Sequence, residues 1–147
     1  MKSSVAQCRF LLQVFNEAVA GLDDSHRAIE PAAGAKTAGW IIGHLSVTGD
    51  FGRKLCGAET ICPKDWRAKF NPGTTPSTNP ADYPSMAELI ATHRNVYTGL
   101  CEAALTADPA LLARENLFVP ARPSLHQIDD EKDEERCRQH DHADGGG

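Results

Sequence analysis

The stretch WIIGHL at residues 40–45 is the most informative part of the sequence, because it places a histidine inside the most hydrophobic run of the chain. Thr37 before it is a suitable N-cap, and apolar side chains recur after it at helical spacing. The pattern predicts a helix over residues 37–56. Its predicted inward stripe consists of Trp40, Ile41, Leu45, Thr48, Phe51 and Leu55. His44 lies one turn beyond Ile41, so we expect it to face the interior.

Glycine is unusually frequent in this predicted helix, at positions 39, 43, 49 and 52. Each glycine costs roughly 1 kcal/mol relative to alanine inside a helix, so tertiary packing must hold the helix together. Small residues would also let a neighbouring element approach the helix closely.

Further helices are predicted on both sides of this one. Apolar residues recur every three or four positions over residues 5–22, and the capping box SMAE at residues 85–88 begins another helix. His93 belongs to the inward stripe of that helix, and Asp108-Pro109 starts a short helix that runs to about Glu115. Residues 57–84 contain five prolines and are predicted to form a long loop whose Trp66 and Phe70 pack back on the bundle.

Composition excludes several classes of protein. The chain of 147 residues is 41% hydrophobic and 24% charged, which is typical of one globular domain. A net charge of -5 argues against a nucleic-acid partner, and no run is long enough to span a bilayer. The N-terminus lacks the apolar core of a signal peptide, and the five cysteines form no C-x-x-C pair. We therefore expect a cytoplasmic protein with reduced thiols and no membrane partner.

The C-terminal segment differs in character from the rest. Residues 129–138 are almost entirely charged, and a histidine- and glycine-rich ending follows. Such a composition buries too little apolar surface to offset its ordering entropy. The predicted organisation is a helical bundle over residues 1–120 and a charged, mobile tail over residues 121–147. Cys137, His140 and His142 in that tail favour adventitious metal binding over a built site.

His44 and His93 are the candidate metal ligands. Inward histidines on separate helices are a common beginning of a metal site in a bundle core. The alternative for each is a buried histidine bonded to a backbone carbonyl or a hydroxyl group.

Four ordered motifs resemble the DinB-like superfamily of helical proteins: PAAGAKTAGWIIGHL (31–45), GDFGRKLCG (49–57), KFNPGTTP (69–76) and DYPSMAEL (82–89). The resemblance covers roughly residues 5–120. It implies an up-and-down four-helix bundle, often a homodimer, with a divalent metal, commonly zinc or nickel, at one end. It also implies a metal ligand in the G-H-L context, which matches His44, and further ligands in an H-x-x-x-H segment before G-Q in a fourth helix. Its members include thiol-dependent transferases and isomerases and metal-dependent hydrolases.

The chain departs from the family after Val119, where His126 has no partner four residues later and no apolar stripe continues. The predicted fold class is thus an all-α DinB-like bundle with three long helices and a short one, its fourth helix missing or degenerate. Without such a helix the fold loses on the order of 10 kcal/mol of stabilisation from buried apolar side chains, which is comparable with the net stability of a domain. The apolar groove left by the missing helix could be covered by a homodimer or by the short helix. A frameshifted or truncated reading frame is a third explanation of the charged C-terminal segment.

Two hypotheses about function follow. In the first, the protein is a metal-dependent hydrolase or thiol-dependent transferase acting on an unknown small molecule. In the second, it is a catalytically inactive bundle that acts as a dimerising binding or stress-associated module.

Overall fold

A computed structural model of the chain describes residues 2–114, and within this part all regular structure is helical. The elements are α1 (Lys2–Ala18), α2 (Ala38–Leu55), α3 (Trp66–Phe70), the 3₁₀ helix η1 (Pro80–Asp82), α4 (Met86–Thr106) and α5 (Pro109–Leu112). Three long helices and a short one after them confirm the predicted all-α class. The predicted tail, its boundary at residue 120 and the question of a fourth bundle helix lie outside the described residues. No helix in residues 2–114 is long and apolar enough to cross a membrane.

The predicted helix starts are confirmed by their capping bonds. The Thr37 hydroxyl accepts from the Trp40 amide at 3.2 Å, and the Ser85 hydroxyl accepts from the Glu88 amide at 3.1 Å. The Asp108 carboxylate caps α5 through the Ala110 amide at 2.8 Å. These bonds satisfy amide groups that have no partner inside the helix, so the local sequence is sufficient to set where each helix begins.

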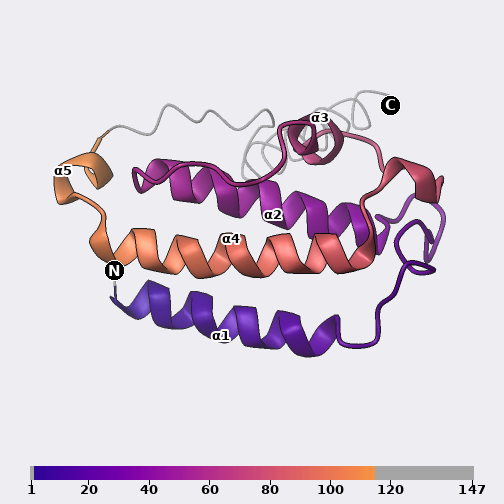
Figure 1. Ribbon diagram of the computed structural model, residues 1–147, viewed down its shortest axis with the longest axis horizontal. Coiled ribbons are helices and arrows are strands. Elements are labelled where there is room, and N and C mark those ends of the chain that lie inside the picture. The colour runs from indigo at the N-terminus through magenta and orange to yellow at the C-terminus, as the bar shows by residue number, and fades with distance from the viewer. Residues whose placement is uncertain (1, 115–147) are drawn as a thin grey trace, which may run out of the picture. The chain divides into compact units, whose positions relative to one another are not determined.

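Helix α4 is the central element, and both α1 and α2 pack on it (Figure 1). Positions 49 and 52 of α2 lie against Val96 and Leu100 of α4, so these two helices run in the same direction. Helix α1 runs antiparallel to α4, as shown by the hydrogen bond between Asn16 near the end of α1 and Arg94 near the start of α4. The long segment between α2 and α4 carries the chain back along α2 and makes the parallel arrangement possible.

The predicted inward face of α2 is wrong by about one position. Its buried residues are Gly39, Trp40, Ile42, Gly43, Ser46, Val47, Gly49 and Asp50. Ile41 and Leu55 of the predicted stripe remain 43% and 42% exposed. Half of the inward face is glycine or serine, because neighbouring elements supply large side chains at these positions. A Cβ at Gly43, for example, would lie 2.6 Å from the Phe70 ring. The expected close approach at glycine is therefore confirmed.

The segment between α2 and α4 folds back on the bundle, as predicted from its aromatic residues. Trp66 and Phe70, both in the short helix α3, are only 2% and 1% exposed. Their rings meet edge to face, with centroids 5.4 Å apart, and Phe70 also stacks on Tyr83 at 6.1 Å. The loop thus contributes core residues of its own and has a defined place on α2.

Asp50 fastens the start of this segment to α2. The carboxylate is 1% exposed and accepts from the amides of Ile61 at 2.8 Å and Cys62 at 3.2 Å. Arg53 lies 3.7 Å from the same carboxylate and donates to the Glu59 carbonyl. Burial, and to a smaller extent the nearby Asp50 charge, raises the pKa of the Cys62 thiol to about 12.

Asp50→Asn is expected to lower the free energy of unfolding by about 2 kcal/mol. The asparagine side chain has one uncharged acceptor oxygen, so it cannot offer a separate oxygen to each of the amides of Ile61 and Cys62. Urea denaturation measures this loss. The Cys62 thiol of the variant should also react faster with a maleimide, because the Asp50 charge that helps to raise its pKa is removed. Asp65→Asn is the matched control, since the Asp65 side chain is 62% exposed and forms a surface ion pair with Lys69. Equal stability of the two variants would contradict a fastening role for Asp50.

Candidate functional site

His44 is oriented by a backbone carbonyl. Its Nδ1 lies 2.8 Å from the carbonyl oxygen of Phe70, and its side chain is half-buried on α2. A carbonyl oxygen only accepts, so Nδ1 must carry the proton and donate it. In the neutral ring, Nε2 then keeps its lone pair. This is the arrangement in which a histidine is prepared to bind a metal through Nε2.

Trp40 fixes the plane of the His44 ring. The two rings are stacked, with centroids 4.7 Å apart and planes 7° from parallel. They come together because residues four apart share one face of a helix. Lys36 Nζ lies 4.6 Å from the centre of the Trp40 ring. The histidine is therefore held both by a hydrogen bond and by an aromatic surface.

A hollow of about 340 Å³ lies against Trp40, whereas His44 is not among the residues that line it. Its lining residues are Trp40, Ala68, Lys69, Phe70, Thr74, Thr75, Ser77, Asp82 and Tyr83. The Tyr83 hydroxyl donates to the Ser77 carbonyl at 2.8 Å and can accept from Thr37 at 2.9 Å. These bonds connect the start of α2 to the returning segment, the stretch of residues 56–85 between α2 and α4. The hollow therefore has a fixed wall with a mixed polar and aromatic lining.

His93 lies in a different environment, inside the contact between α1 and α4. It is 3% exposed, with its ring centroid 3.6 Å from that of Phe15 and 4.5 Å from that of Tyr97. Its Nδ1 has no hydrogen-bond partner among the described residues. Burial, and secondarily the Arg94 charge, lowers the pKa of His93 to about 4. The ring is thus a neutral part of the core at ordinary pH.

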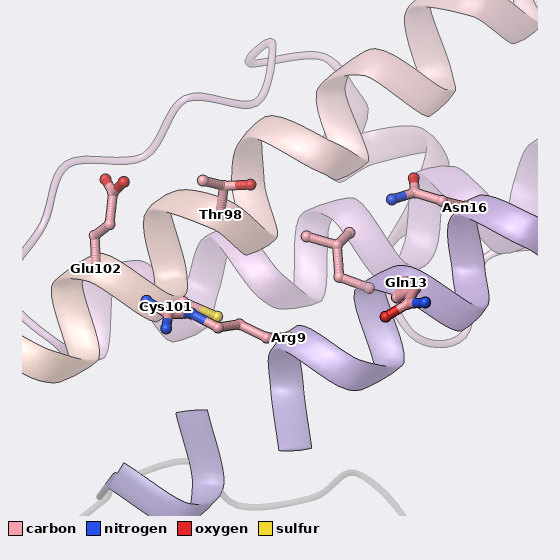
Figure 2. Close-up of a pocket in the computed structure, with 7 residues that line it drawn as sticks. Arg9, Gln13, Asn16, Thr98, Cys101 and Glu102 are labelled. Atoms are coloured by element: carbon pink, nitrogen blue, oxygen red, sulfur yellow. The ribbon is translucent and has the colours of Figure 1, made fainter. Parts of the chain in front are cut away.

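A second hollow, of about 350 Å³, opens between α1 and α4 (Figure 2). Arg9, Gln13 and Asn16 line it from α1, and Thr98, Cys101 and Glu102 line it from α4. Burial raises the pKa of the nearby Cys8 thiol to about 11, with a further contribution from Cys101. A thiol with so high a pKa is protonated at neutral pH, so Cys8 is a poor nucleophile. The four cysteines of the described part, Cys8, Cys56, Cys62 and Cys101, are all free.

The two histidines predicted as ligands have separate surroundings. His44 contacts Trp40 and Phe70, whereas His93 contacts Phe15 and Tyr97. Residues 2–114 contain no group of three or more His, Cys, Asp or Glu side chains that could hold a metal. His44 fits the requirements of one metal ligand, but the described residues do not offer a complete set.

Sequence reasoning missed the groups that orient His44. The Phe70 carbonyl carries no side-chain signal, and the partner of the Trp40 indole, Thr74, lies 34 residues away in the chain. Asp50 did leave a signal, because an acidic residue inside the most apolar helix requires buried partners.

The fold and the site together define an all-helical bundle protein with a carbonyl-oriented histidine on its second long helix. The sequence model of the DinB superfamily matches residues 7–128, which is most of the chain. The chain therefore belongs to the DinB superfamily, and the resemblance seen in its motifs is confirmed. No curated protein and no solved structure matches it.

Proposed function

We propose that the protein is a divalent-metal-dependent enzyme of the DinB superfamily, and that His44 binds the metal through Nε2. The proposed reaction is a hydrolysis or a thiol transfer on a small molecule, with zinc or nickel as the metal. The observation that supports this most directly is the 2.8 Å bond from His44 Nδ1 to the Phe70 carbonyl. Ligand histidines commonly donate their second ring nitrogen in this way, which fixes the tautomer and increases the basicity of the ligand nitrogen.

The remaining ligands of this site have to come from residues beyond 114 or from a second chain, because residues 2–114 do not supply them. A divalent metal would supply Lewis acidity to a bound water or thiol. We do not propose His93 as a ligand, since it is only 3% exposed and aromatic rings stack on it. The homodimer inferred from the sequence stays a prediction.

The first test is the metal content of the untagged protein. We expect about one zinc or nickel per chain by elemental analysis, and we expect His44→Ala to lose it. His26→Ala is the matched control, because His26 lies in the turn after α1 and bonds Asp23 there. A wild-type protein without metal would refute the metal proposal, and full occupancy in His44→Ala would remove His44 from the site. Assays for hydrolysis and thiol transfer follow only if the metal is present.

A further inference from the structure

The turn at residues 71–74 of the returning segment carries Thr74, which bonds the Trp40 indole that stacks on His44. The Thr74 amide donates to the Asn71 carbonyl at 3.1 Å, and Gly73 has a φ of 90°. Proline at the second position and glycine at the third, with positive φ, are typical of a type II turn. The Asn-Pro-Gly-Thr sequence therefore sets the position of the Thr74 side chain.

The Thr74 hydroxyl is fully engaged. It accepts from the Trp40 indole nitrogen at 3.0 Å and lies 2.9 Å from the carbonyls of both Lys69 and Asn71. A hydroxyl has one proton to donate and two lone pairs, so these carbonyls direct the proton and leave a lone pair for the indole. Trp40 in turn stacks on His44 within 7° of parallel. The ring plane of His44 thus depends on a hydroxyl 30 residues further along the chain.

The same short segment also provides the Phe70 carbonyl that accepts from His44 Nδ1. One piece of chain, residues 69–74, therefore determines both the plane and the tautomer of the histidine. Phe70 is 1% exposed and packs on Gly43, next to His44 in α2, so the segment has little freedom to shift.

We infer that Thr74 is a positioning residue for His44, acting through the Trp40 indole to keep the His44 ring in the orientation that presents Nε2. The effect on metal affinity rests on the proposed function. The effect on the ring does not, because it follows from contacts that need no metal.

The experiment uses the full chain and two readouts. The first is the His44 tautomer in metal-free protein, measured by ¹⁵N NMR of the neutral imidazole. The second is the Zn²⁺ dissociation constant, measured by competition with a chromophoric chelator. Thr74→Val keeps the shape of the side chain but removes the hydroxyl group. Without the hydroxyl the Trp40 indole loses its acceptor, and the stacked His44 ring is free to turn away from the Phe70 carbonyl. We therefore expect this variant to mix the two tautomers of His44 and to weaken Zn²⁺ binding about 10- to 100-fold, as loss of an outer partner does at metal sites.

Matched variants separate positioning from general damage. Thr74→Ser restores the hydroxyl and should behave as wild type. Thr78→Val, at an exposed position of the same loop outside the lining of the hollow, should change neither readout. Trp40→Phe keeps an aromatic ring but lacks the indole N–H, so it should reproduce Thr74→Val and carries the test if that variant does not fold.

Failure of this inference and failure of the proposed function give different results. If the wild-type protein binds no Zn²⁺, the proposed function fails, and the tautomer measurement alone decides the role of Thr74. If Zn²⁺ binds through His44 but Thr74→Val and Trp40→Phe leave both the tautomer and the affinity unchanged, the positioning role is overturned while the metal site stands.

Discussion

Phe70→Ala is expected to lower the free energy of unfolding by about 3 to 5 kcal/mol, the usual cost of removing a buried phenylalanine ring. The ring is 1% exposed, meets Trp66 edge to face and stacks on Tyr83, so neighbours cannot easily collapse into the space. Chemical denaturation of the two proteins measures the difference.

A second substitution makes this prediction specific. A Cβ at Gly43 would lie 2.6 Å from the Phe70 ring, so Gly43→Ala should destabilise the wild-type protein by about 1 to 3 kcal/mol. Once the ring is removed, the same substitution meets open space and should be neutral or stabilising by up to about 1 kcal/mol, because alanine favours helix. If Gly43→Ala costs the same in both backgrounds, the contact between α2 and α3 is not the reason for the glycine.

Acidification is expected to destabilise the fold through His93 by about 3 kcal/mol between about pH 6.5 and about pH 4. Burial, then Arg94, lowers the pKa of His93 to about 4 in the folded protein, whereas an unfolded histidine titrates near 6.5. Above about pH 6.5 the ring is neutral in both states, and the stability is fully present. As pH falls below that value, the unfolded chain takes up a proton that the folded protein does not, so the free energy of unfolding falls.

Urea denaturation at several pH values tests this assignment in wild type and in His93→Phe. The variant keeps an aromatic ring between Phe15 and Tyr97 but cannot titrate, so its stability should depend less on pH over this window. An unchanged pH dependence in His93→Phe would mean that other groups cause the acid sensitivity.

Much of the fold could be predicted from local sequence. The capping residues Thr37, Ser85 and Asp108 mark the helix starts, and the apolar repeats identify the helices. Helix α1 ends at Ala18 and not at the predicted Leu22, because the next residues tighten into turns. Helix ends are less well determined by pattern than starts with a capping side chain.

The inward face of α2 could not be predicted from α2 alone. A periodicity argument assigns large apolar side chains to the core, and this rule fails when the partner supplies the large side chain. Here Phe70, Tyr97 and Leu100 approach the glycines of α2, so the small residues face inward.

The positions of the helices, the membership in the DinB superfamily and the importance of His44 all follow from the amino-acid sequence. The protonated nitrogen of His44 and the plane of its ring, in contrast, become apparent only in the folded chain. Both depend on a carbonyl and a hydroxyl 26 and 30 residues further along the chain. Spacing along a helix specifies which residues share a face, but hydrogen bonds between distant segments form only when packing brings those segments together.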